Sequence, residues 1–250
     1  MSTEAVAPPS RERFAQNDGV KVRYLDNDPP HPEGLPIVFV PGVTDFADEY
    51  TAALEFMVPR RLIVVEMRGR GGSDAPPTGY SVPEQASDVE TVIGDTGIGR
   101  FHLMTFSRGT TPAIEVALAD PTRVASLSIG DYWAAEIALP LGWVDHQWAS
   151  RWRGRPMPER VQRHVLEQIA GSARARDLWE DVAGLGIPVL VARGDSGGLL
   201  TDLPVERYRQ SIPGVEVVEI TGSGHDLFRP DRLAYPAAVL EFIDRRTTDA

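Results

Sequence analysis

The 250-residue chain contains no cysteine, which excludes disulfide bonds, a thiolate nucleophile and a cysteine-bound zinc site. Basic residues are also scarce: 25 lysines and arginines face 36 aspartates and glutamates, for a net charge of -11. A nucleic-acid-binding surface needs a basic stripe, so we expect no nucleic-acid partner. No stretch approaches the roughly 20 apolar residues of a membrane-spanning helix, so we expect no membrane partner either.

The N-terminal sequence adds two expectations. It begins MSTEAVAPPS and lacks the basic end and apolar run of a secretory signal peptide, so a cytoplasmic protein is the default expectation. Residues 1–12 are polar and contain proline, which predicts a flexible tail. The chain shows no internal repeat and no linker, and we therefore expect a single domain over residues 1–250.

After the tail, short apolar runs alternate with amphipathic stretches. A strand that is buried on both faces has a continuous apolar run, and helices that connect parallel strands cover the faces of the sheet. The pattern therefore predicts an α/β fold with a mostly parallel sheet flanked by helices. We expect strands over residues 20–25, 36–40, 62–66, 101–105, 124–129, 188–191 and 215–220, and helices over 49–57, 83–95, 110–118, 204–212 and 233–243.

The alternation breaks between residues 132 and 186. This segment holds all five tryptophans, several prolines and a helix-like run over 159–169. We interpret it as an inserted helical lid over the carboxyl edge of the sheet, where open α/β folds bind ligands. Trp133, Trp143 and Trp148 are the predicted pocket residues; the alternative is that the tryptophans form the core of the lid itself.

A candidate nucleophile lies in the segment 101–111, FHLMTFSRGTT, between an apolar strand and an alanine-rich helix. Thr105, Ser107 and Gly109 form a small-x-Ser-x-Gly version of the nucleophile elbow, in which a strand turns sharply into a helix with serine at the apex. The turn exposes the serine Oγ, and N–H groups at the start of the helix point toward a developing oxyanion. Ser107 is our candidate nucleophile; the alternative is a plain helix N-cap.

Two further segments accompany this motif. The strand at 36–40 runs into Pro-Gly-Val at 41–43, and residues 66–74 have the sequence EMRGRGGSD. With the serine motif, they resemble the α/β-hydrolase superfamily, in its branch of serine esterases, lactonases and peroxidase-like enzymes. The resemblance implies an eight-stranded, mostly parallel sheet with a small helical lid, and an oxyanion hole formed by the backbone N–H groups of Val43 and Arg108. We assign no chemistry to the 66–74 loop.

The resemblance also implies a catalytic histidine after the last strand. Of the five histidines, only His225 lies there, in the loop TGSGH at 221–225. The glycines of this loop allow it to bring the imidazole back over the sheet edge toward Ser107. His225 is our candidate general base, and a surface-loop histidine is the alternative.

The acid that orients the histidine has two candidates. In this superfamily it usually lies three or four residues beyond a glycine in the loop after the strand at 188–191, but Gly197 and Gly198 occupy those positions. The acid can also lie at the end of the strand after the nucleophile helix, and Asp131 is there. We favour Asp131, with Asp195 as the alternative acid; a purely structural role for Asp131 also stays open. Such an acid sets the imidazole tautomer and stabilises the imidazolium.

Together these residues predict acyl transfer on a small molecule. Ser107 would attack an ester, lactone or thioester of a small-to-medium, partly hydrophobic substrate, with His225 as general base and then acid. No metal and no organic cofactor is implied, because neither a metal-ligand cluster nor a dinucleotide fingerprint occurs in the sequence. The same fold hosts ligand receptors, cyclases and lyases that form no acyl-enzyme, and these are the alternative functions.

Overall fold

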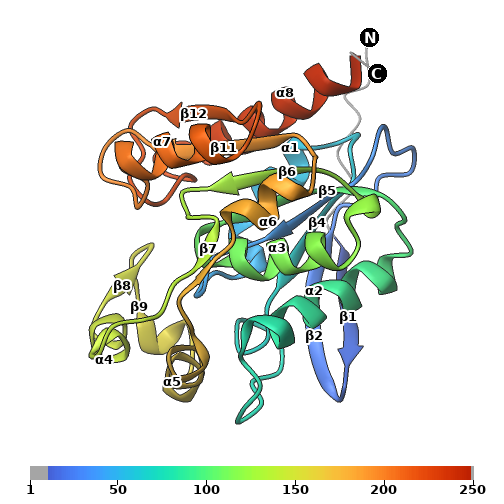
Figure 1. The fold of residues 1–250 in the computed structure, drawn as a ribbon. Helices are drawn as coiled ribbons and strands as arrows, with labels where there is room; N and C mark the ends of the chain where they lie inside the picture. The colour runs from blue at the N-terminus through green and yellow to red at the C-terminus, as the bar shows by residue number, and fades with distance from the viewer. Residues whose placement is uncertain (1–10, 249–250) are drawn as a thin grey trace.

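A computed structural model describes residues 11–248, and its central feature is one eight-stranded sheet (Figure 1). The strand order is β1-β2-β4-β3-β5-β6-β11-β12. β2 pairs antiparallel with both β1 and β4, and every other neighbouring pair is parallel, which confirms the predicted mostly parallel sheet. The strands are β1 (Arg11–Asn17), β2 (Val20–Asp26), β3 (Ile37–Val40), β4 (Leu62–Glu66), β5 (Phe101–Phe106), β6 (Val124–Gly130), β11 (Val189–Gly194) and β12 (Glu216–Ile220).

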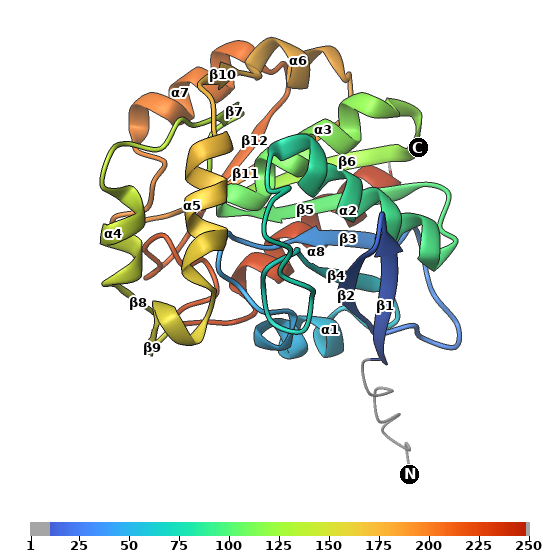
Figure 2. The same ribbon diagram turned by 90° about the horizontal axis from the view of Figure 1, so that it is seen from below.

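Helices cover both faces of this sheet (Figure 2). Successive side chains of a strand point to opposite faces, so Val38 and Val40 of β3 enter one core cluster while Ile37 and Phe39 enter the other. The first face is covered by α2 (Val82–Thr96), α3 (Thr110–Ala119), α6 (Trp179–Gly184) and α7 (Asp202–Ser211), and the second by α1 (Thr51–Phe56) and α8 (Ala234–Thr248).

The first strand corrects one expectation from the sequence. Arg11 and Glu12, predicted to belong to a flexible tail, are the start of β1 and pair with Asp26 and Leu25 of β2. Most side chains along β1 are exposed, so no apolar run marks this edge strand in the sequence, and the backbone pairing with β2 holds it in place. The remainder of the predicted tail, residues 1–10, lies outside the described residues.

Between β6 and β11 the chain leaves the sheet and forms a compact excursion (Figures 1 and 2). A separate apolar cluster, which includes Met157, Val165 and Ile169, forms its interior. The residues that flank the excursion, Ala134 before it and Leu178 after it, pack into the core cluster on the face of the sheet that α2, α3, α6 and α7 cover. Its elements are β7 (Ala135–Glu136), α4 (Trp143–Trp148), β8 (Arg151–Trp152), β9 (Arg155–Pro156), α5 (Arg163–Ser172) and β10 (Arg176–Asp177), followed by α6.

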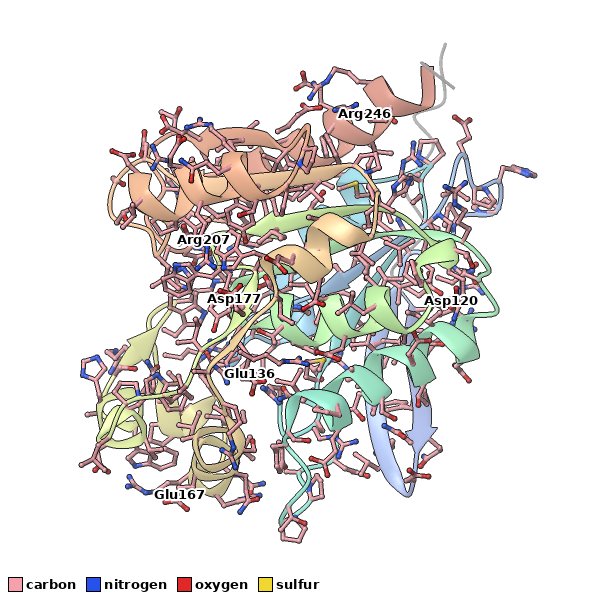
Figure 3. All side chains as sticks on the ribbon, viewed as in Figure 1. Asp120, Glu136, Glu167, Asp177, Arg207 and Arg246 are labelled. Atoms are coloured by element: carbon pink, nitrogen blue, oxygen red, sulfur yellow. The ribbon has the colours of Figure 1, made fainter. Side chains whose placement is uncertain are left out.

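The base of the excursion is tied together by polar contacts. β7 and β10 pair antiparallel, and Glu136 of β7 accepts the backbone N–H of Arg174 at 2.9 Å. Asp177 of β10 forms an ion pair with Arg207 of α7, so the excursion is also connected to the sheet domain (Figure 3). No helix within residues 11–248 has the length and apolar character needed to cross a membrane.

Candidate active site

The serine motif folds as a sharp turn between β5 and α3. Ser107 follows the last residue of β5 directly and has a backbone φ of 51°, a left-handed conformation that costs free energy for a residue other than glycine. Two residues later, a Cβ on Gly109 would lie 2.2 Å from the carbonyl oxygen of Pro41. The turn therefore requires glycine at 109 because the backbone of the β3 loop passes against it.

Thr105 stands where the superfamily usually has glycine, and the fold accommodates its hydroxyl. The Thr105 side chain is fully buried, and its Oγ1 lies 2.9 Å from Thr110 Oγ1 and donates to the carbonyl of Ser128 at 3.1 Å. A buried hydroxyl is tolerated when it is hydrogen-bonded. Threonine at this position is therefore compatible with the turn.

The structure brings His225 between Ser107 and Asp131. In the loop after β12, His225 Nε2 lies 2.9 Å from Ser107 Oγ and Nδ1 lies 2.7 Å from Asp131 Oδ2. The imidazole ring stacks on Phe106 with the ring centroids 5.1 Å apart, which limits its rotation. The three side chains form one hydrogen-bonded series although Asp131 and His225 are 94 positions apart in the chain.

Asp131 is held by backbone groups of the loop that follows β11. Its side chain is fully buried and accepts the N–H groups of Leu199 at 2.7 Å and Leu200 at 3.1 Å. A Cβ on Gly198 would lie 2.5 Å from the Asp131 carboxylate, so glycine there permits the close approach. The alternative acid, Asp195, is exposed and accepts the Gly222 N–H at 2.9 Å.

The two residues predicted for the oxyanion hole, Val43 and Arg108, both line the cavity in front of Ser107. The loop that carries Val43 is fixed from two sides. Asp45 Oδ2 accepts the Gly42 N–H at 2.9 Å, and Arg70 Nε donates to the Val43 carbonyl at 2.8 Å.

Arg70 belongs to the 66–74 loop, and the sequence contained no signal of this contact. Burial lowers its pKa to about 10, so its guanidinium remains cationic at neutral pH. Arg68 of the same loop forms a buried ion pair with Asp88 at 2.7 Å, which is a structural role.

The cavity beside Ser107 has a volume of about 400 Å³. Trp133 and Trp143 line it, as does Trp152, which the sequence did not single out for this role. Trp148, the third predicted pocket residue, does not line the cavity. It packs within the excursion, and the guanidinium carbon of Arg163 lies over its ring, 5.7 Å from the centroid. Five residues along α4 amount to roughly 140° beyond a full turn, so Trp148 points away from Trp143.

Trp152 connects the excursion to the sheet domain directly over the site. Its ring centroid lies 6.0 Å from that of His225 and 6.4 Å from that of Phe106. Its Nε1 donates to Asp45 Oδ1 at 2.7 Å. Tyr50 donates its hydroxyl to the other oxygen of Asp45 at 2.7 Å, and burial together with Asp45 keeps the Tyr50 pKa well above its ordinary value, so the hydroxyl retains its proton.

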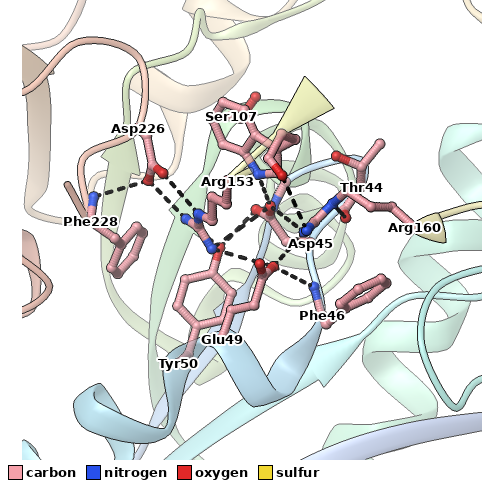
Figure 4. A network of polar contacts seen from close by, with 12 residues as sticks. Thr44, Asp45, Phe46, Glu49, Tyr50, Ser107, Arg153, Arg160, Asp226 and Phe228 are labelled. Atoms are coloured by element: carbon pink, nitrogen blue, oxygen red, sulfur yellow. Dashed lines mark hydrogen bonds and ion pairs between the residues drawn. The ribbon is translucent and has the colours of Figure 1, made fainter. Parts of the chain in front are cut away.

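Two buried arginines next to Trp152 complete this polar network (Figure 4). The Arg153 side chain is 4% exposed; its Nε lies 2.8 Å from Asp226, the residue after His225, and its Nη1 lies 3.4 Å from Glu49. Arg160 is fully buried and lies 2.6 Å from the same Glu49. The network therefore joins the excursion both to the turn that precedes α1 and to the loop that carries His225.

This fold, with a serine turn after the fifth strand of the sheet and a histidine loop after the last, defines an α/β hydrolase. A family model described as the alpha/beta hydrolase family matches residues 37–241, and the chain belongs to that family. A candidate carbamate hydrolase of Variovorax paradoxus (strain S110) is 24% identical over 217 residues, which cover 74% of this chain and 82% of the relative.

Two solved structures have similar folds. An esterase from Exiguobacterium antarcticum superposes with a TM-score of 0.76 at 22% identity, over 94% of this chain and 100% of that one. The enol-lactonase from Burkholderia xenovorans LB400 superposes with a TM-score of 0.76 at 20% identity, over 93% of this chain and 100% of that one. At such identities the likeness establishes the shared fold alone.

Proposed function

We propose that this chain is a serine hydrolase that cleaves an ester, lactone or thioester through an acyl-enzyme on Ser107. The observation that carries the proposal is the hydrogen-bonded series of Ser107, His225 and Asp131, with distances of 2.9 and 2.7 Å. A nucleophile, a base and an orienting acid in this order are the parts that acyl transfer needs. The relatives are named for carbamate, ester and lactone hydrolysis, which supports a hydrolase without selecting a substrate.

The proposed reaction begins when Ser107 Oγ attacks the carbonyl carbon while His225 Nε2 accepts the hydroxyl proton. The backbone N–H groups of Val43 and Arg108 stabilise the resulting oxyanion, typically by about 3 kcal/mol for each donor. The intermediate then collapses, the bond to the leaving group breaks, and His225 returns the proton to the leaving oxygen or sulfur. Water attacks the acyl-enzyme by the same steps and regenerates free Ser107.

In this proposal, the excursion over residues 135–177 is the lid of the site. The range is narrower than the 132–186 expected from the sequence because the flanking residues pack under the sheet. The lid contributes Trp143, Trp152 and Met157 to the cavity, and their apolar surfaces suit a partly hydrophobic substrate.

The test combines turnover with covalent labelling. Wild-type protein and Ser107→Ala are assayed with short p-nitrophenyl esters and treated with a serine-directed fluorophosphonate, followed by intact-mass measurement. We expect turnover and one covalent adduct for the wild type, and neither for Ser107→Ala. A folded wild type with no adduct and no turnover would contradict the proposal. Product formation that survives Ser107→Ala would instead indicate a cyclase or lyase, and tight ligand retention without turnover would indicate a receptor.

A further inference from the structure

Three side chains of acidic or basic residues other than His225 line the cavity beside Ser107: Asp45, Arg108 and Arg151. Asp45 is already compensated: it is 2% exposed and lies 4.0 Å from Arg153 and 3.9 Å from Arg160. Its two oxygens also accept the hydrogen bonds described above. The anionic residue of the cavity is therefore occupied within the protein and leaves the two arginines as the groups that could bind a charged ligand.

Among the described residues, the side-chain hydrogen bonds of both arginines go to neutral groups. Arg108 Nη1 lies 3.4 Å from the Tyr132 hydroxyl and 3.2 Å from the Ile137 carbonyl oxygen, and both of those residues line the cavity. Its half-buried guanidinium therefore lies along that wall. Arg151 is exposed and donates to the Gly154 carbonyl at 2.6 Å. Within residues 11–248, neither arginine forms an ion pair.

This lack of an acidic partner is notable in a chain with 36 acidic residues and 25 basic ones. Arg153 and Arg160, next to the same cavity, are each paired with carboxylates. A guanidinium presents five N–H donors in a planar fork that matches a carboxylate, and the long contacts of Arg108 use only one nitrogen. A half-buried arginine left in this state next to a candidate nucleophile favours an anionic ligand.

We infer that the substrate of the proposed hydrolase carries a carboxylate, which the Arg108 side chain binds, with Arg151 as a second cationic group at the same cavity. The inference rests on the proposed function. Arg108 directly follows Ser107, so its backbone N–H would face the oxyanion while its guanidinium holds the carboxylate toward Tyr132 and Ile137. The ester carbonyl and the carboxylate then belong to one small molecule.

The experiment compares two esters that differ in one end group: the mono-p-nitrophenyl ester of adipic acid, which ends in a carboxylate, and p-nitrophenyl hexanoate, which ends in a methyl group. The measured quantity is the ratio of their kcat/KM values, because a change at Arg108 can also disturb the neighbouring oxyanion N–H. We expect the wild type to favour the adipate ester by about tenfold or more, the discrimination typical of a charged hydrogen bond.

Arg108→Gln should remove most of that preference, Arg108→Lys should retain part of it, and Arg151→Gln should reduce it less. Arg155→Gln is the matched control, because Arg155 is exposed on the adjacent strand β9 and does not line the cavity; its ratio should equal that of the wild type. A wild type without preference for the adipate ester, or an Arg108→Gln variant that keeps the full preference, would overturn the inference.

A binding measurement separates this inference from the proposed function. Adipate is added to folded Ser107→Ala protein, and the melting temperature is compared with that of the Ser107→Ala/Arg108→Gln double variant. We expect adipate to raise the melting temperature of the first protein only. Hydrolysis of the hexanoate ester with no adipate preference and no such rise overturns the carboxylate subsite and leaves the hydrolase intact. If adipate raises the melting temperature only when Arg108 is present, and the wild type hydrolyses neither ester, the result supports the carboxylate subsite and contradicts the proposed hydrolase.

Discussion

Asp131→Asn tests the role of the acid most directly, because the structure shows what the carboxylate does with each oxygen. Oδ2 faces both His225 Nδ1 and the Leu199 N–H, and Oδ1 accepts the Leu200 N–H. An asparagine amide has one acceptor oxygen and one NH₂ group. In Asp131→Asn the NH₂ group therefore replaces one of the two carboxylate oxygens and faces a backbone N–H, of Leu199 or of Leu200, that loses its acceptor.

The magnitude follows from the two amide orientations. With NH₂ toward His225, the imidazole must accept at Nδ1 and carry its proton on Nε2, where it can no longer take the proton of Ser107. With NH₂ toward Leu200, the tautomer is correct but the imidazolium loses its anionic partner. For an Asp→Asn change in a triad we expect a loss on the order of 10⁴-fold in kcat, about 5.5 kcal/mol. The unpaired backbone N–H also costs about 1–3 kcal/mol of folding stability.

The assay is kcat on a p-nitrophenyl ester together with the rate of fluorophosphonate labelling, on protein shown to be folded by circular dichroism. Asp195→Asn is the matched control: Asp195 is exposed, and an asparagine oxygen can still accept the Gly222 N–H, so we expect activity close to the wild type. A folded Asp131→Asn variant within about tenfold of wild-type kcat would refute the reasoning. A large loss in Asp195→Asn alone would identify Asp195 as the acid.

Three further predictions concern stability. Arg153→Met removes a buried guanidinium, leaves the largely buried Asp226 without its ion-pair partner and leaves Glu49 with Arg160 alone. We expect a loss of about 3–5 kcal/mol and a melting temperature roughly 6–20 °C lower; a change below about 2 °C would contradict the role of the network. Burial lowers the pKa of His102 to about 4, so below pH 6.5 the unfolded state binds a proton that the folded state does not. The free energy of unfolding therefore falls by about 3 kcal/mol as the pH drops from 6.5 to 4. In denaturant titrations His102→Gln should lose this part of the acid sensitivity, and an unchanged pH profile would contradict the prediction. Gly109→Ala should lower the melting temperature, because the added Cβ would lie 2.2 Å from a carbonyl oxygen. Gly94→Ala is the control: its Cβ in α2 would meet nothing within 4 Å, so it should raise the melting temperature slightly. Equal effects of the two substitutions would show that the close approach at Gly109 does not require glycine.

Local patterns in the sequence were sufficient for the parallel strands, for most of the helices that cover them and for the turn at Ser107. The continuous apolar runs around Val38 and Leu103 predict strands buried on both faces, and both lie in the centre of the sheet. The small-x-Ser-x-Gly spacing predicts the turn at Ser107 because the whole motif lies within five consecutive residues, although the contact that requires glycine at 109 comes from the β3 loop. The edge strand β1 escaped this reasoning because its stability comes from pairing with β2 rather than from its own apolar side chains.

The partners of the site depend on contacts between residues far apart in the chain. Asp131 and Asp195 were both compatible with the sequence, and only the pairing of β6 with β11 shows that the loop at Gly198 passes against Asp131 while Asp195 faces solvent. The contacts of Trp152 with Asp45, and of Arg70 with the Val43 loop, likewise left no local pattern.

The sequence by itself therefore determined the class of fold and the strand that precedes Ser107, because both depend on the burial of short apolar runs and on the spacing of a short motif. The resemblance to the α/β hydrolases, carried by such motifs, located the histidine loop. Tertiary structure alone decided which acid meets His225, which tryptophans reach the cavity and which arginines there lack an acidic partner within residues 11–248. These choices depend on how separate elements pack, and side chains more than a few residues apart acquire their neighbours only when the sheet, the helices and the excursion between β6 and β11 come together.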